Sequence, residues 1–464
     1  MANYILFSRH VDSNDGSSSR TAPSFEFILS AELRNGADLR IDDRLLLLSK
    51  QHGTTQILPQ TLHVQLIQGT TITTQSLARY RNPVVVDEAR TILQRGLVPG
   101  LNAVTEDEFQ AIIDRMGGVR LSEIEMLSHI KRYIAARGYY FDDETLYNYH
   151  ICLKTRPFVI LAGLSGTGKS KLSQLYAEAI GHTVSEGRYL RLAVRPSWND
   201  DRYLLGYFNT ISNDYVTEPA LDFILDAEAD RRNLYFFCLD EMNLAHVEYY
   251  FSQFLSAMEE ENPADRRIIL YGRSLEKRLA NQSSRPGIDR TVFLPTNLLF
   301  TGTINVDETT QPISDKVIDR ANTIEFFQVA LDRIPDKQPP PEPLDISADL
   351  WHSYTNPKPD TSYREHVIQI SQILNDGQLG LGYRVVREIE RYLANSHGLL
   401  EPDVAFDLQV KQRVLPRIRG AMPIRDMLRR LQAYVEQNGW SRSGERLKEM
   451  ESRLKRDGYT SFWR

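Results

Sequence analysis

The segment Gly163–Ser170, GLSGTGKS, constrains the fold of this chain more than any other. It matches the pattern G-x-x-x-x-G-K-[ST] in full, and it lies between the apolar run FVILA and the helically spaced segment KLSQLYAEAI. The glycines allow consecutive backbone N–H groups to face one anion, and the start of the helix adds partial positive charge. The sequence therefore predicts a strand, a phosphate-binding turn and a helix, in that order.

Two side chains of this motif have distinct expected roles. Lys169 is placed to reach the β- and γ-phosphates of a nucleotide, and the Ser170 hydroxyl to hold Mg²⁺. The alternative is a chance glycine-rich turn, and the flanking strand and helix patterns argue against it. The residues expected to bind the nucleotide are Gly163, Leu164, Ser165, Gly166, Thr167, Gly168, Lys169 and Ser170.

A second apolar run, LYFFCLDEMN, ends in two acidic residues. A nucleotide-hydrolysing site needs an acid at the end of a buried strand near the phosphate loop. We therefore expect Asp240 to contribute to the Mg²⁺ shell and Glu241 to polarise the attacking water. The alternative is that both acids only begin the following helix, where the helix dipole favours them. The phosphate loop favours the metal-binding interpretation.

The segment GTINVDETT follows the apolar run NLLFT and indicates another strand that ends in polar residues. If this strand ends beside the γ-phosphate, Asn305 can bind the phosphate and orient water. Asp307 lies two residues further on, and residues two apart in an extended segment share a face. The alternative is a polar strand end with a turn-forming Asp.

Two arginines are candidates for contacts with the γ-phosphate. Arg320, in DKVIDRANTIEF, precedes another strand and could reach the nucleotide of a neighbouring subunit, where a guanidinium stabilises transition-state charge. Arg384 begins a helix after the glycines of LGLGYRVVREIERYL and could fold back over the nucleotide. The alternatives are a surface salt bridge for Arg320 and a solvated helix charge for Arg384.

Strands alternate with helices from the phosphate loop onward, which indicates an α/β fold with a parallel sheet covered on both faces. We expect a small strand-containing module at 1–117, a P-loop core at 118–335, a Pro-rich linker at 336–350 and a helical lid domain at 351–464. The patterns of the last part are wholly helical.

The bulk properties exclude several classes of protein. The formal net charge of -6 argues against a general nucleic-acid coat, although a local basic patch remains compatible with it. No apolar stretch is long enough to span a membrane, and the N-terminus lacks a basic region and a cleavage site of small residues. Cys152 and Cys238 lack metal-binding spacing. We therefore expect a cytoplasmic protein.

Five strings, GLSGTGKS, VRPSWNDDRYLLGYFN, LDEMNLAHVEYYFSQFLSAME, FTGTINVDETT and DKVIDRANTIEF, together resemble AAA+ NTPases of the McrB type, a branch related to dynein and MoxR. The resemblance covers roughly residues 118–464. It implies an AAA+ core with a helical lid, a homo-oligomeric ring, usually a hexamer, and Mg²⁺-dependent hydrolysis of GTP or ATP at subunit interfaces. By this resemblance, Gly163–Ser170 is Walker A, Asp240 and Glu241 are Walker B, Asn305 is sensor 1, Arg320 is the finger and Arg384 is a sensor-2 candidate.

Proteins of this type are motor subunits of McrBC-like restriction systems that act against phage, so the resemblance also implies an McrC-like nuclease partner. No lysine of the chain follows an Asp or Glu by two positions, so the commonest nuclease motif of such systems is absent. DNA could be contacted by the N-terminal module, which occupies the place of the family's target-recognition domains, or by the basic insertion Ala264–Arg290 near a ring pore. The insertion could also be only a solvated loop.

Some alternatives stay open. The family signature has two residues between its Asn and Asp, whereas Asn305 and Asp307 have one between them. This pair is expected at the γ-phosphate end, far from the base, so the choice between GTP and ATP is open and GTP is favoured on family grounds alone. The other functions considered are a MoxR-like remodelling ATPase acting on proteins and a nucleotide-switched assembly scaffold.

Overall fold

The computed structural model divides the chain into two compact units, Met1–Ser122 and Glu123–Arg464, and each is described by itself. Asp307 and part of the Ala264–Arg290 insertion lie outside the described residues. The described residues are 2–7, 25–28, 39–40, 43–51, 54–68, 71–79, 84–95, 97, 100–115, 121–212, 214–280, 288–306, 311–327 and 330–463.

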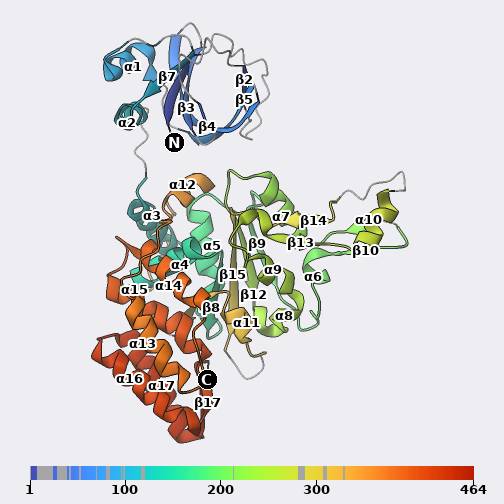
Figure 1. Cartoon of the computed structure of the whole chain (residues 1–464), viewed down its shortest axis with the longest axis vertical. Helices are drawn as coiled ribbons and strands as arrows, with labels where there is room; N and C mark the ends of the chain where they lie inside the picture. The colour runs from blue at the N-terminus through green and yellow to red at the C-terminus, as the bar shows by residue number, and fades with distance from the viewer. Residues whose placement is uncertain are drawn as a thin grey trace. The chain divides into compact units, whose positions relative to one another are not determined.

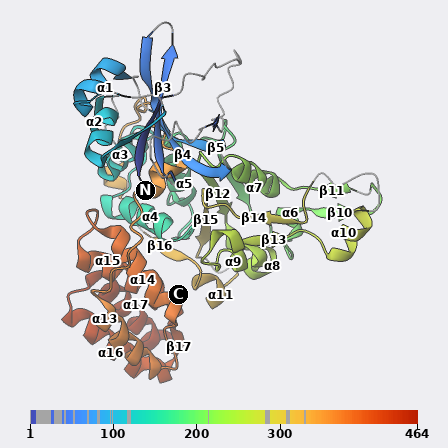
Figure 2. The ribbon, with the colours of Figure 1, turned by 45° about the horizontal axis from the view of Figure 1, so that its top comes forward.

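Over its described residues, the first unit contains one mixed sheet and two helices, α1 (Val86–Leu93) and α2 (Glu106–Arg115), which lie beside the sheet (Figure 2). In the described residues the strand order is β2-β5-β4-β3-β1-β7, with β6 paired to β4. Ile5, Leu46 and Phe109 belong to the apolar core between sheet and helices. The strands are β1 (Asn3–Phe7), β2 (Phe25–Ile28), β3 (Arg44–Gln51), β4 (Thr54–Gln68), β5 (Thr71–Arg79), β6 (Val84–Val85) and β7 (Gly100–Val104).

The second unit is built on a parallel sheet with the order β16-β8-β15-β12-β9 (Figure 1). The α/β fold expected from the sequence is therefore confirmed. Every residue of β8 and β12 is buried, which is typical of strands covered by helices on both faces. The strands are β8 (Phe158–Gly163), β9 (Tyr189–Ala193), β12 (Tyr235–Asp240), β15 (Leu298–Asn305) and β16 (Asn322–Phe326).

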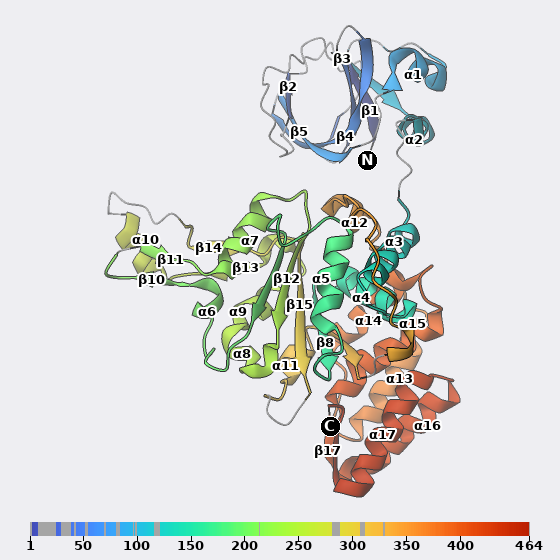
Figure 3. The same cartoon turned by 180° about the vertical axis from the view of Figure 1, so that it is seen from behind.

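Helices cover both faces of this sheet. Figure 3 shows α5 on one face and α7 and α9 on the other, and α5 contacts β8, β12 and β15. The helices around the sheet are α3 (Glu123–Ala136), α4 (Asp143–Thr155), α5 (Lys169–Ala179), α6 (Arg202–Leu205), α7 (Pro219–Ala229), α8 (Val247–Tyr250), α9 (Ser252–Ala257) and α11 (Asp315–Ile318).

The strand order brings the site residues together. β8, β15 and β12 are consecutive neighbours, so their carboxyl ends, at Gly163, Asn305 and Asp240, meet at one edge of the sheet. β8 also pairs with β16, and a Cβ on Gly163 would lie 2.0 Å from the carbonyl oxygen of Phe326. A residue with a side chain therefore does not fit at the first position of the phosphate loop.

Two small hairpins extend from the second unit. One pairs β10 (Tyr207–Asn209) with β11 (Asp214–Val216). The other pairs β13 (Arg267–Ile269), in the basic insertion, with β14 (Thr291–Phe293), which follows the insertion directly, and α10 (Arg273–Ala280) lies between them in the sequence. Over the described residues, no helix has the length and apolar character needed to cross a membrane.

The C-terminal part packs helices around a core that includes Phe406 and Trp440, whereas Trp351 and Tyr392 bond to Tyr176 and Asn148 of the preceding helices. It is not wholly helical, because it contains a short antiparallel pair, β17 (Arg419–Ala421) and β18 (Tyr459–Ser461). Its helices are α12 (Ala348–Ser353), α13 (Arg364–Asn375), α14 (Tyr383–Ser396), α15 (Pro402–Gln409), the π-helix η5 (Val410–Val414), α16 (Arg425–Gln437) and α17 (Ser441–Asp457).

The Pro-rich segment before these helices is irregular but attached to the second unit. Gln338 N–H donates to the carbonyl of Ala136, and Leu344 N–H donates to that of Ala179. Its position after the core fits the expected linker, while the proposed division into core, linker and lid stays a prediction.

Candidate nucleotide-binding site

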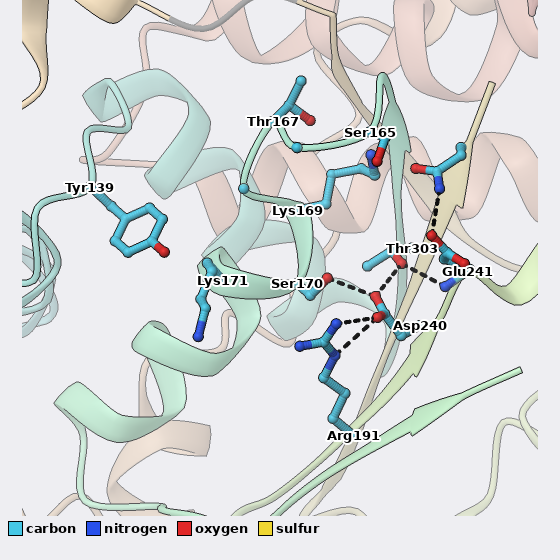
Figure 4. Close-up of a pocket in the computed structure, with 13 residues that line it drawn as sticks. Tyr139, Ser165, Thr167, Lys169, Ser170, Lys171, Arg191, Asp240, Glu241 and Thr303 are labelled. Atoms are coloured by element: carbon cyan, nitrogen blue, oxygen red, sulfur yellow. Dashed lines mark hydrogen bonds and ion pairs between the residues drawn. The ribbon is translucent and has the colours of Figure 1, made fainter. Parts of the chain in front are cut away.

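A cavity of about 330 Å³ opens at the carboxyl edge of the parallel sheet (Figure 4). It contains both polar strand ends and most of the phosphate-loop motif, which are far apart in the sequence. The lining residues are Tyr139, Ser165, Gly166, Thr167, Gly168, Lys169, Ser170, Lys171, Arg191, Asp240, Glu241, Thr303 and Asn305.

The phosphate loop has the geometry expected of an anion-binding turn. Gly166 and Gly168 have φ angles of +78° and +89°, a region that favours glycine. Lys169 begins α5, and its buried ammonium donates to the carbonyl oxygens of Leu164 at 2.6 Å and Gly163 at 3.2 Å. Burial lowers the pKa of Lys169, and the carboxylates of Asp240 and Glu241 oppose that shift.

Asp240 is the most heavily bonded carboxylate of the cavity. Its Oδ1 accepts hydrogen bonds from Ser170 Oγ at 2.6 Å and Thr303 Oγ1 at 2.8 Å, and its Oδ2 accepts one from Arg191 Nε at 3.0 Å. Burial alone would raise the pKa of Asp240, but these donors outweigh it, so the pKa lies below its usual value. Asp240 is therefore held as a carboxylate.

Glu241 adopts an unusual backbone conformation for a residue with a side chain. Its φ and ψ angles are 53° and 46°, and its N–H donates to Thr303 Oγ1 at 2.9 Å. The Glu241 carboxylate accepts a hydrogen bond from Asn305 Nδ2 at 2.9 Å. The turn thus directs the carboxylate of Glu241 toward the end of β15, and the two predicted catalytic side chains are in direct contact.

Oxygen donors at this site fit a magnesium ion. Ser170 and Asp240 supply a hydroxyl and a carboxylate that already contact each other. Mg²⁺ in nucleotide sites is bound through one or two such protein oxygens together with phosphate oxygens and water. Among the residues that the structure describes, no cluster of three or more His, Cys, Asp or Glu side chains offers a protein-only metal cage.

The two predicted arginines lie elsewhere. Arg320 Nε and Arg384 Nη1 both donate to Glu259 Oε1, at 2.7 Å and 2.5 Å, and neither arginine lines the cavity. The structure therefore brings Arg320 and Arg384 together, but not beside Lys169 and Asp240 of the same chain. Their catalytic roles stay predictions, as does the role of Asp307.

The sequence interpretation missed two functional groups of the cavity. Thr303 lies two residues before Asn305 on β15, so alternation along the strand could have identified it. Arg191 is a charged residue within β9, and β9 pairs with β12, so it could have been noticed as an arginine in the strand YLRLA. Its contact with Asp240 depends on the order of the strands, which the sequence does not state.

The fold and the cavity define an α/β protein in which a phosphate-loop motif lies at the carboxyl edge of a parallel sheet, beside two acidic residues. Residues 345–459 match a domain of unknown function, DUF8727. Among solved structures, one similar protein is a candidate ATPase from Cytophaga hutchinsonii, with 13% identity and a TM-score of 0.43, covering 66% of this chain and 90% of that chain.

A second similar structure is the closed state of Hsp104 with ATPγS and FITC casein. It has 16% identity and a TM-score of 0.31, and covers 52% of this chain and 42% of that chain. No curated protein matches the chain. At these TM-scores the likenesses add nothing to the fold assignment, which rests on the strand order and the phosphate loop.

Proposed function

We propose that this protein is a Mg²⁺-dependent AAA+ nucleoside triphosphatase. The observation that carries the proposal is the convergence of the phosphate loop, Asp240, Glu241 and Asn305 on one cavity. A site that only bound nucleotide would not need the direct contact between Glu241 and Asn305. That pair is suited to holding a water molecule beside the terminal phosphate.

The residues that line the cavity have different proposed roles in hydrolysis. Lys169 now donates to two loop carbonyls, and phosphate oxygens in the loop would accept those hydrogen bonds instead. Ser170 and Asp240 would hold Mg²⁺, which supplies charge neutralisation at the phosphates. The carboxylate of Glu241 accepts a proton from the attacking water, while the Asn305 amide holds that carboxylate in place.

The nucleotide base is proposed to lie near Tyr139. This residue lines both the main cavity and a smaller, more apolar one of about 40 Å³, which Tyr140, Phe141 and Lys131 also line. Aromatic rings can pack against a purine. No carboxylate among the residues lining the smaller cavity is placed to read guanine, so GTP and ATP both remain substrates to test.

The two arginines on Glu259 support assembly of several subunits, as in the ring that the AAA+ resemblance implies. Arg320 and Arg384 are cations outside their own cavity, and they share one carboxylate. We assign them to the terminal phosphate of a neighbouring subunit. Such an arginine increases the rate of phosphoryl transfer by about 10³–10⁵.

The finer proposal is the role of motor subunit in a McrBC-like anti-phage system with a nuclease partner. It rests on the strings that resemble McrB-type proteins, and contacts with DNA through the first unit or the basic insertion belong to the same proposal. A MoxR-like ATPase that remodels proteins is the second candidate. The exposed apolar side chains of Tyr207, Ile211 and Val216, gathered on the hairpin of β10 and β11, favour it because exposed apolar surface can contact a polypeptide.

The test compares turnover of GTP and ATP with Mg²⁺ for the wild type and for Glu241→Gln. The variant keeps an oxygen for Asn305 but loses the base, so we expect turnover to fall by about 10²-fold or more with nucleotide affinity retained. Glu445→Gln, at an exposed position on α17, is the matched control and should leave turnover unchanged.

Two outcomes would count against the proposal, and a third would decide between the two finer candidates. Equal turnover by Glu241→Gln would remove Glu241 from catalysis. Binding of both nucleotides without turnover by the wild type would favour the assembly scaffold. ATP turnover with GTP inert, unaffected by a co-expressed nuclease, would favour the remodelling ATPase over the McrB-like motor.

A further inference from the structure

Asn243 lies just behind the cavity, in the turn η2 (Met242–Leu244) that follows Glu241. It is 4% exposed and does not line the cavity. A buried amide must find hydrogen-bond partners, because an unpaired one loses its contacts with water without compensation. The partners of Asn243 therefore indicate what this residue does.

The Asn243 side chain bonds to the backbone of Asn305 in both directions. Asn243 Nδ2 donates to the carbonyl oxygen of Asn305 at 2.9 Å, and Asn305 N–H donates to Asn243 Oδ1 at 3.3 Å. A neighbouring strand makes the same pair of contacts in a β-ladder. The side-chain amide of Asn243 thus replaces the hydrogen bonds that a neighbouring strand would make to the last residue of β15.

A substitute is needed there because β12 leaves the sheet too early. The ladder between β12 and β15 ends at the pair Leu239 and Gly302, and the chain turns away at Glu241. Asn305 pairs with Gly163 on the β8 side, and it lies three residues beyond the last pair of the β12 ladder. On the β12 side, the Asn243 side chain makes the hydrogen bonds to the Asn305 backbone.

Asn243 also bonds to the chain beyond β15. Gln311 N–H donates to the Asn243 carbonyl at 2.8 Å, so Asn243 is bonded to residues on both flanks of the segment 307–310. The turn η2, which carries Asn243, is itself held in place, because the Tyr250 hydroxyl donates a hydrogen bond to the Met242 carbonyl at 2.7 Å. Asn243 is therefore attached to a fixed element on one side and to the end of β15 on the other.

We propose that Asn243 is a positioning residue that sets the contact between Glu241 and Asn305. The inference rests on the proposed hydrolysis at this site. Asn243 lies two residues after Glu241 in the same turn and holds the Asn305 backbone, so it fixes the spacing between the two side chains that meet at 2.9 Å. Without it, the amide of Asn305 no longer holds the carboxylate in the orientation that activates water.

The test measures kcat, KM and nucleotide affinity for Asn243→Ala, Asn305→Ala and the double variant. We expect kcat to fall about 10–100-fold in Asn243→Ala while KM and nucleotide affinity change less than about 3-fold, because the phosphate loop is intact. The double variant should be hardly slower than Asn305→Ala, since both changes break one unit. Additive losses would overturn the proposal.

Asn297 offers a matched control, because it is a buried asparagine just before the other end of β15. Its Nδ2 donates to the carbonyls of Ala227, Asp230 and Asn233 at 2.7–3.1 Å. Asn297→Ala should lower thermal stability without a selective fall in kcat. If it lowers kcat as much as Asn243→Ala does, the effect of Asn243 is only structural and the proposal fails.

Amide hydrogen exchange gives a readout that does not need turnover. The peptide that contains Asn305 should exchange faster in Asn243→Ala than in the wild type, and at the wild-type rate in Asn297→Ala. If exchange in Asn243→Ala equals that of the wild type, the positioning role is overturned, even if the wild type proves inactive. If exchange is faster in the variant but the wild type is inactive, only the proposed hydrolysis is contradicted. If Asn243→Ala does not fold, Asn243→Asp keeps the acceptor for Asn305 N–H, loses the donor and adds a negative charge, so kcat should still fall and an unchanged kcat would overturn the proposal.

Discussion

Gly302 has no side chain because Met242 occupies the space that one would fill. A Cβ built on Gly302, in the middle of β15, would lie 2.1 Å from the sulfur of Met242. Met242 follows Glu241 directly, so the packing of this pair determines how closely the turn approaches the strand. The position of the proposed catalytic base therefore depends on a glycine three residues before Asn305.

Replacing Gly302 by Ala should destabilise the protein and slow turnover together. Overpacking a buried site costs about 1–3 kcal/mol, and here the displaced Met242 carries the Glu241 turn with it. Chemical denaturation and steady-state turnover measure the two effects. Gly382→Ala is the control, because Gly382 has a φ angle of -80° and nothing within 4 Å of the added carbon.

Met242→Ala makes room for the new methyl group. The double variant should therefore be less destabilised than the sum of the two single variants. Strictly additive losses, or a neutral Gly302→Ala, would show that the turn does not depend on this contact.

At the scale of elements, local patterns were sufficient for the sheet and the phosphate loop. Consecutive apolar residues bounded by glycine or acid predicted β8, β12 and the polar end of β15, because these signals lie within a few neighbouring residues. The contacts of Arg191 and Asn243 could not be predicted, since they depend on strand order and on a left-handed turn at Glu241. The same holds for the short β17–β18 pair within the helical part.

The helix α11, which directly precedes Arg320, is held by a buried arginine from the C-terminal part. Arg413, in the π-helix η5, donates to the carbonyls of Ile318, Asp319 and Ala321. The carbonyls at the end of a helix have few intrahelical partners, so Arg413 supplies further donors to the last residue of α11 and to the chain just after it. Arg413 also pairs with the buried carboxylate of Glu388. The backbone around Arg320 is thus fixed by helices that follow it in the sequence.

Arg413→Met should therefore lower the free energy of unfolding by about 3–5 kcal/mol, because it leaves the buried Glu388 carboxylate with Arg156 alone and removes the Arg413 donor from the Ala321 carbonyl. Urea denaturation monitored by circular dichroism measures the change. Arg429→Met, which removes a half-exposed partner of Glu451, should cost about 1 kcal/mol or less. Equal effects of the two substitutions would contradict the role given to Arg413.

At the scale of the whole molecule, the charges around Glu259 favour a function outside their own chain. Burial first, then repulsion from Arg384, Arg320 and Arg266, lowers the pKa of Arg156 to about 10, and the carboxylate of Glu259 opposes that shift. The Glu259 carboxylate thus lies among several arginines. An excess of positive charge is suited to a polyphosphate, and the chain's own cavity does not include these arginines.

Mixing inactive subunits tests whether Arg320 serves a neighbour. Arg320→Ala and Glu241→Gln should each lose turnover, Arg320→Ala by about 10³-fold. In mixed assemblies, a subunit with an intact Glu241 can lie beside one with an intact Arg320, so turnover should rise above that of either variant alone. The control mixes Arg320→Ala with the double variant Glu241→Gln/Arg320→Ala, in which no complete site can form and no recovery is expected. If Arg320→Ala alone is fully active, the ion pair between Arg320 and Glu259 is only a structural salt bridge. If the first mixture shows no recovery of turnover, each chain uses its own arginine.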